Sequence, residues 1–160
     1  MRILVMSDTH IPRAAADLPA KLYAEIKNVD MILHAGDFVE KELLDKLEVL
    51  RPTKGVYGNM DSAKIRSILN AKEVVEIKGL KIGLIHGYGP QADMIETVKK
   101  EFGRVNAVVF GHAHKVFNEI RNGILFFNPG SPTDTIFAPY RSYGILEITD
   151  GKIEGNIVRC

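Results

Sequence analysis

The stretch Glu73–Gly87, "EVVEIKGLKIGLIHG", decides the fold because the pattern of the chain changes there. Two apolar runs rich in β-branched residues are joined by Lys78-Gly79, an arrangement typical of a β-hairpin. Before this stretch, short apolar runs alternate with amphipathic segments. After it, one amphipathic segment at 93–102 is followed only by strand-like runs. The sequence predicts an α/β fold whose N-terminal half has parallel strands and whose C-terminal half is meander-like.

The segments before the hairpin give the expected order of elements. We expect strands within 2–7, 29–37 and 53–61, and helices within 18–28, 41–50 and 62–69. Asp17 and Pro19 are placed to start the first helix, and Asp61 or Ser62 to start the third. Later in the chain, Asn122-Gly123 and Asp150-Gly151 indicate two more hairpin turns.

Composition limits the classes of function. The chain has 160 residues, which suits a single domain spanning 1–160, and no repeat or linker divides it. A net charge of +1 gives no reason to expect nucleic acid as a partner, and no apolar run is long enough for a membrane span. Cys160 is the one cysteine, which suits a reducing compartment, so we expect a cytoplasmic protein. The edges of the C-terminal hairpin leave homo-oligomerisation open.

Polar residues with metal-ligand chemistry follow five of the expected strands. In open α/β sheets the loops beyond the carboxyl ends of the strands converge, and sites form there. The set contains four of the five histidines in the chain, two carboxylates and one amide. Such an inventory exceeds what one ion needs and suits two divalent ions that share a carboxylate. The residues are Asp8, His10, Asp37, Asn59, His86, His112 and His114.

Each of these residues also has a structural interpretation. Asp8 or Asp37 could cap the helix that follows its strand, and Asn59 could be a turn residue with left-handed backbone. His86 could be a core histidine whose hydrogen bonds are satisfied within the protein. The i, i+2 spacing in "DTH" and "HAH" lets both members of each pair point the same way if the backbone stays extended.

Five short motifs carry a family resemblance. The segments "SDTH" (7–10), "HAGD" (34–37), "GNMD" (58–61), "IHG" (85–87) and "GHAH" (111–114) occur in a fixed order, followed by "NPGS" at 128–131. In order and approximate spacing they resemble the blocks of the calcineurin-like metallophosphoesterase family, and most closely its small single-domain bacterial and archaeal phosphodiesterases. The resemblance implies a layered αββα sandwich with two mixed β-sheets flanked by helices.

The same resemblance implies a binuclear site and a reaction. Asp8, His10, Asp37 and His114 would bind one divalent ion. Asp37, Asn59, His86 and His112 would bind the other, so that Asp37 bridges. The family uses manganese, nickel, iron or zinc, and we expect manganese first. A hydroxide held between the ions would attack a small-molecule phosphate ester in line, and for this branch we expect a phosphodiester. Asp8, Asp37, Asn59 and His86 are the expected catalytic residues.

One position departs from the family pattern. The third block usually has a histidine that assists catalysis where this chain has Met60, and a thioether cannot donate a proton. We therefore expect substrates with good leaving groups to be favoured. The neighbouring Asp61 could act as an acid, but a helix N-cap role is at least as well supported.

Other polar residues near these motifs have weaker assignments. His34 matches no ligand position, and we expect it at a strand end or behind the ligands. Tyr88 could line the substrate cleft or belong to a plain surface loop. Arg13 and Arg141 are candidate phosphate contacts, although most arginines are simply solvated.

A second class of function competes with the enzyme. The retromer subunit of eukaryotic cells resembles this chain in "HIP…LPAK" (10–21) and in "KIGLIHG" (81–87), and it works mainly as a protein-interaction scaffold with a partly replaced metal site. Here all seven ligand positions hold residues able to bind metal, which favours the enzyme. A metal-binding regulator without turnover is a third alternative.

Overall fold

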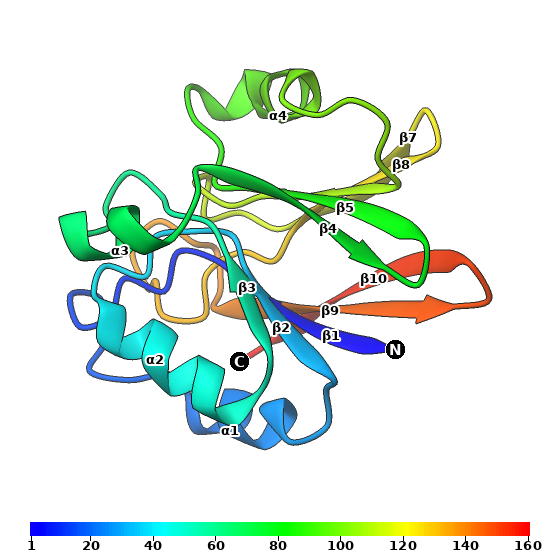
Figure 1. Ribbon diagram of the computed structural model, residues 1–160. Coiled ribbons are helices and arrows are strands. Elements are labelled where there is room, and N and C mark those ends of the chain that lie inside the picture. Colours follow the sequence, from blue (N-terminus) through cyan, green and yellow to red (C-terminus); the bar gives the residue numbers. More distant parts are fainter.

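Apolar side chains on both faces of the central strands produce the layers of the molecule. In the computed structural model, which describes residues 1–160, Ile3 and Val5 of β1 (Arg2–Met6) face a core between two sheets. Leu4 and Met6 of the same strand face a second core beneath helices. A strand that is buried on both faces has to lie inside a layered structure. Figure 1 shows the resulting order of helices, sheet, sheet and helix.

Each sheet has five strands. The order in the first sheet is β10 (Lys152–Arg159), β9 (Ser142–Thr149), β1, β2 (Met31–His34) and β3 (Thr53–Gly55). The order in the second is β4 (Lys72–Ile77), β5 (Leu80–Ile85), β6 (Ala107–Val109), β8 (Ile124–Asn128) and β7 (Phe117–Arg121). Both sheets are mixed, and the expected αββα sandwich is confirmed.

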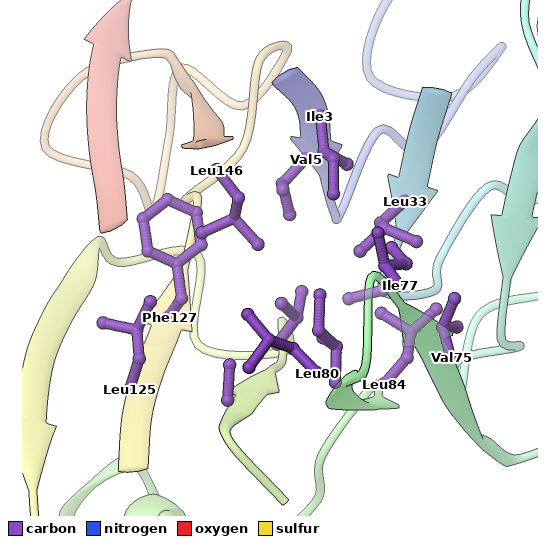
Figure 2. Close-up of a cluster of buried hydrophobic side chains, with 14 of the residues drawn as sticks. Ile3, Val5, Leu33, Val75, Ile77, Leu80, Leu84, Leu125, Phe127 and Leu146 are labelled. Carbon is purple, nitrogen blue, oxygen red and sulfur yellow. The ribbon is translucent and has the colours of Figure 1, made fainter. Parts of the chain in front are cut away.

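The helices lie on the two outer faces. The first sheet is covered by α1 (Ala20–Ile26), α2 (Lys41–Leu50) and α3 (Ala63–Ile68), and the second by the 3-10 turn η1 (Gln91–Asp93) and α4 (Met94–Lys100). Between the sheets, side chains such as Val5 and Leu146 point toward Leu84 and Phe127 (Figure 2). None of the helices has the length and apolar character needed to span a bilayer.

The expected C-terminal meander is wrong in two respects. Strands β5, β6 and β8 are parallel to one another. Helix α4 connects β5 to β6, and β7, which lies beyond β8 at the edge of the sheet, runs antiparallel to β8. The hairpin of β9 and β10 then leaves the second sheet and pairs with β1 in the first. The reason is burial: Tyr143 and Ile145 of β9 face the helices while Leu146 and Ile148 face the core between the sheets. Such a strand needs both faces covered.

The hairpin turns themselves are confirmed. Lys78 and Gly79 have φ of 51° and 77°, and Asn122-Gly123 and Asp150-Gly151 have the same pair of positive φ values within a few degrees. Positive φ at both central residues is what a two-residue turn of type I′ requires.

Candidate metal centre

The seven residues with metal-ligand chemistry all lie in loops that follow parallel strands. Strands β1, β2 and β3 are parallel to one another in the first sheet, as are β5 and β6 in the second, so within each sheet their carboxyl ends lie at the same edge. The loops after these strands carry, in order, Asp8 and His10, Asp37, Asn59, His86, and His112 with His114. The structure brings all seven side chains together, although 106 positions separate the first from the last in numbering (114 minus 8).

One group forms around Asp8. The Asp8 Oδ1 atom is 3.3 Å from Nε2 of His114 and 4.0 Å from Nε2 of His10. The two imidazole Nε2 atoms are 3.3 Å apart. One potential ligand atom from each residue lies within 4.8 Å of those of the other two, a spacing that could hold an ion.

The other group forms around Asp37 and Asn59. The Asp37 Oδ2 atom is 3.3 Å from Nε2 of His86, and the Asn59 Oδ1 atom is 3.1 Å from the same nitrogen. The Asn59 oxygen is also 3.2 Å from Nδ1 of His112. Asp37 Oδ2 is in addition 3.6 Å from Nε2 of His10, so this carboxylate lies between the two groups.

Asp8 also lies between the groups. Its Oδ1 atom is 3.9 Å from Nε2 of His86, and Asp8, Asp37 and His86 form a second set with mutually close ligand atoms. The arrangement therefore offers two carboxylates at the boundary of the groups, where the family resemblance implies only Asp37. Both carboxylates are removed from water, with Asp8 0% and Asp37 2% exposed.

Buried negative charge of this kind needs positive charge beside it. Burial disfavours the charged form of both imidazoles, but the Asp37 and Asp8 carboxylates raise the pKa of His86 to about 9. The Asp8 and Asp134 carboxylates likewise raise the pKa of His114 to about 9. In the chain without metal, protons on His86 and His114 thus balance the two carboxylates. Divalent ions would replace those protons, and the donor set of imidazole, carboxylate and amide oxygen fits them.

The two remaining imidazoles are held in the form that binds metal. Burial lowers the pKa of His10 despite the nearby charges of Asp37 and Asp8. Burial and the charge of His86 lower the pKa of His112. A neutral imidazole keeps a lone pair free, which ligation requires.

The backbone at the site is not extended, so the condition under which the i, i+2 pairs would point the same way is not met. Asp8 and His10 have φ of 54° and 44°, and His112 and His114 have φ of 67° and 53°. Asp37 is also left-handed, with φ of 60°. The chain turns sharply after each strand instead of continuing it. Left-handed backbone at non-glycine residues is uncommon and gathers at functional sites.

The capping interpretations of Asp8 and Asp37 are wrong. The Asp8 carboxylate accepts the backbone N–H of His112 at 3.1 Å, and the Asp37 carboxylate accepts that of Met60 at 2.8 Å. Both bonds join loops that are distant in sequence. The bond to Asp37 uses Oδ1 and leaves Oδ2 directed at His86. Both oxygens of Asp8 accept from His112, and Oδ1 also lies near the imidazoles.

Asp61 neither caps a helix nor faces the cleft. Its carboxylate accepts the backbone N–H groups of Asp37 at 3.0 Å, Val39 at 2.6 Å and Gly58 at 2.7 Å. Helix α3 instead has Ser62 as its N-cap, without a side-chain capping bond. Asp61 therefore fixes the loop that carries Asp37, including Val39, whose φ of 84° is strained for a β-branched residue.

His34 lies behind the ligands, as expected. Gly36 N–H donates to its Nδ1 atom at 3.2 Å, so Nε2 carries the proton and donates to Thr9 Oγ1 at 3.1 Å. Burial lowers the pKa of His34 to about 3. This neutral side chain connects the loop after β1 to the loop after β2.

Sequence reasoning missed Asp134. Its carboxylate accepts a hydrogen bond from Nδ1 of His114, which leaves Nε2 as the metal-facing nitrogen once the ring is neutral. The same carboxylate accepts the backbone N–H groups of Ile136, Phe137 and Ala138 at 2.7, 3.1 and 3.0 Å. The nearby "NPGS" motif was the signal that could have drawn attention to this segment. Its Ser131 hydroxyl donates to the carbonyl of Asp8 at 2.7 Å.

A cleft of about 580 Å³ opens over the cluster. Its walls include metal-ligand candidates, Arg13, and an apolar group made of Met60, Ile136 and Phe137. Arg141 and Tyr88 do not line it. Tyr88 instead donates to a carboxylate of Glu101 on the surface, so its surface-loop interpretation holds.

Comparison with known proteins agrees with the fold and the cluster, which together define an α/β protein with a site for divalent metal ions. The chain belongs to the calcineurin-like phosphoesterase superfamily, whose domain model matches residues 1–151. This membership supports a metal-dependent phosphoesterase activity. A probable metallophosphoesterase of Methanocaldococcus jannaschii is 40% identical over 162 residues, covering 99% of this chain and 81% of that protein. A phosphodiesterase of the same organism is 29% identical over 81% of this chain and 83% of that protein.

Two solved structures illustrate the range of similar proteins. An archaeal phosphodiesterase is 26% identical, with a TM-score of 0.74 over 99% of this chain and 100% of that one. Vps29 of Entamoeba histolytica, complexed with zinc, is 27% identical, with a TM-score of 0.75 over 99% of both chains. The fold is thus shared by an archaeal phosphodiesterase and by a zinc-bound Vps29.

Proposed function

We propose that this protein is a phosphodiesterase that works with two divalent metal ions. The observation that carries the proposal is the convergence of five loops on two buried carboxylates, four imidazoles and one amide. Asp8, His10, Asp37 and His114 would hold one ion, and Asp37, Asn59, His86 and His112 the other. When bound, two such ions supply a nucleophile from water at neutral pH and stabilise charge on a phosphoryl group attacked in line.

The chain's own residues position the reaction. The bond from His112 N–H to Asp8 and that from Met60 N–H to Asp37 fix each carboxylate between the two groups. Nδ1–H of His86 donates to the carbonyl of Ala35 at 2.8 Å, which turns Nε2 toward Asp37. Burial of both carboxylates excludes water and strengthens their interaction with any cation.

Two features of the cleft bear on the substrate. Met60 lines the cleft where the family pattern has a histidine, and it cannot protonate a leaving alkoxide, so esters with good leaving groups are favoured. Arg13 is the one lysine or arginine of the cleft, so outside the metal ligands a single cation faces the substrate. A diester carries one negative charge, whereas a monoester carries close to two at neutral pH. The similarity to archaeal phosphodiesterases adds support.

The test combines metal content with hydrolysis. We expect purified protein loaded with manganese to bind two ions per chain and to hydrolyse bis(4-nitrophenyl) phosphate faster than 4-nitrophenyl phosphate. Asp37→Asn should lower the diester rate ~100-fold or more, since loss of an outer hydrogen-bond partner of a ligand alone typically lowers activity 10- to 100-fold. Met60→His should raise the rate for an alkyl monoester, whose alkoxide needs a proton to leave, while leaving metal content at two. Protein that binds no metal, or hydrolyses neither ester with manganese, nickel, iron or zinc, would contradict the proposal.

A protein-interaction scaffold is the second candidate function. The similarity to Vps29 favours it, as do the exposed apolar side chains Ile136 and Phe137 beside the cluster. The two candidates separate on turnover: a scaffold binds metal and hydrolyses no ester.

A further inference from the structure

The cleft has an apolar wall that the metal chemistry does not use. Ile136 and Phe137 are 80% and 74% exposed, and Met60 is 41% exposed, yet all three line the cleft that contains the ligand candidates. An apolar patch that is exposed to water and bordered by polar side chains is typical of a binding surface. We call these three residues the apolar rim.

The backbone that carries the apolar rim is held in place. Three consecutive N–H groups, from Ile136 to Ala138, donate to the Asp134 carboxylate. That carboxylate also accepts from His114, and the Phe137 ring stands edge-on to the His114 ring with centroids 6.1 Å apart. The exposure of Ile136 and Phe137 is therefore a property of a fixed loop tied to the metal centre. A surface prepared in advance loses little entropy when a ligand binds.

Charge and polarity of the cleft define what the apolar rim can accept. Outside the proposed metal ligands, its lining offers one cationic side chain, Arg13, and the negative side chains Asp37 and Asp134 are already engaged by N–H donors. A second phosphate or a carboxylate on the substrate would find no further cation. A flat apolar group would contact Phe137 and the two aliphatic side chains, and aromatic rings prefer such offset or edge-on contacts.

We propose that the apolar rim is a subsite for an aryl or similarly flat, uncharged ester arm of a phosphodiester. The proposal rests on the proposed function and narrows its substrate class. It also fits the chemistry at Met60, because an aryloxide leaves without being protonated more readily than an alkoxide. Substrates with two small alkyl arms would gain nothing from Phe137.

The test separates binding from turnover. Proton NMR titration of the manganese-free, zinc-loaded protein gives Kd for diphenyl phosphate and for dimethyl phosphate. We expect diphenyl phosphate to bind about tenfold more tightly, and Phe137→Ser to remove most of that preference. Ile136→Ser should reduce it about threefold. Val49→Ser, at an 87% exposed apolar position on α2 outside the cleft, is the matched control and should keep the wild-type ratio.

Hydrolysis rates of bis(4-nitrophenyl) phosphate and methyl 4-nitrophenyl phosphate, which release the same leaving group, give a parallel ratio. A Phe137→Ser protein with wild-type metal content and an unchanged preference in both assays overturns the subsite, whether or not the protein turns over. If neither ester is hydrolysed but the Kd ratio depends on Phe137, the subsite stands and the phosphodiesterase fails. If Phe137→Ser changes the sedimentation mass and leaves the Kd ratio unchanged, the apolar rim is an interface between copies, and the subsite is also overturned.

Discussion

Left-handed backbone occurs in two regions of this molecule for different reasons. At the hairpin turns, Gly79, Gly123 and Gly151 have positive φ and open space where a side chain would stand. At the metal centre, the left-handed ligand candidates are Asp and His, whose side chains are needed, and the neighbouring glycines are tightly enclosed. The turns use a conformation that is easy for their residues. At the metal centre the same conformation is strained because it is adopted by non-glycine residues, and packing and hydrogen bonds stabilise it.

The largest expected effect comes from filling the enclosed space. A Cβ at Gly58 would stand 2.1 Å from Oδ1 and 2.7 Å from the backbone N of Asp37. Gly58 is not among the residues with positive φ, so the penalty of Gly58→Ala is steric. We expect the free energy of unfolding in urea to fall by about 3 kcal/mol. We also expect diester hydrolysis to fall ~100-fold, because the displaced carboxylate is a proposed ligand.

A second enclosed glycine provides a check on Gly58→Ala should that protein not fold. A Cβ at Gly111 would stand 2.8 Å from Oδ2 of Asp8. Gly111→Ala should therefore also reduce metal content. If both variants kept wild-type metal content and activity, the enclosure of these two glycines would not be required for the metal centre, and the proposed difference between the two regions would be wrong.

The contrast between hairpin turns and metal-centre loops also explains which features could be predicted from the sequence. The hairpin turns depend on two adjacent residues, and they were predicted correctly. The grouping of Asp8, Asp37 and the histidines followed from the rule that loops after parallel strands converge. The left-handed backbone at Asp8 and His112 was missed because it is set by a bond between loops 104 positions apart, not by local spacing.

Two other features escaped for a similar reason. The binding of Asp61 to three backbone N–H groups depends on how the loops after β2 and β3 meet. The partnership of Asp134 with His114 depends on the path of a segment without any periodic pattern. Sequence patterns report period and turn chemistry, whereas these contacts come from tertiary packing.

The next effect in size concerns Asp134. In Asp134→Asn, Oδ1 can still accept from Ile136 and Phe137, but the NH2 group cannot accept from His114. We expect metal affinity to fall about 10- to 100-fold at one of two sites, measured by competition with a chelator. Asp150→Asn is the matched control, because Asp150 is left-handed in a hairpin turn with φ of 52°. Equal metal affinity in the two variants would show that Asp134 does not position His114.

A smaller effect, visible only in acid, concerns His34. Folding favours its neutral form, since its pKa is about 3 in the fold against 6.5 in a free side chain. Its contribution is complete above pH 6.5 and is lost as pH falls toward 3, by up to about 1.4 kcal/mol per pH unit. Protonation would remove the acceptor of Gly36 N–H and loosen the strained loop that follows.

The measurement for His34 is urea unfolding of metal-free protein between pH 6 and pH 4. His34→Asn keeps an acceptor for Gly36 without titrating, so its stability should fall less steeply with acid than that of the wild type. Titratable groups that do not interact with His34 contribute equally to both proteins and cancel in the difference. Parallel slopes would mean that the imidazole is not held neutral.

The smallest expected effect is that of a substitution in the β7–β8 hairpin turn, where only the cost of left-handed backbone is measured. Gly123 has φ of 77°, and a Cβ added there would meet nothing within 4 Å beyond its chain neighbours, so Gly123→Ala faces no steric barrier. The left-handed conformation alone should lower the free energy of unfolding by about 1 kcal/mol. Metal content and diester hydrolysis should not change, because the turn between β7 and β8 does not line the cleft of the metal centre. A loss near that of Gly58→Ala would mean that left-handed backbone in an open turn destabilises the protein as much as steric enclosure at the metal centre, and the distinction between the two regions would fail.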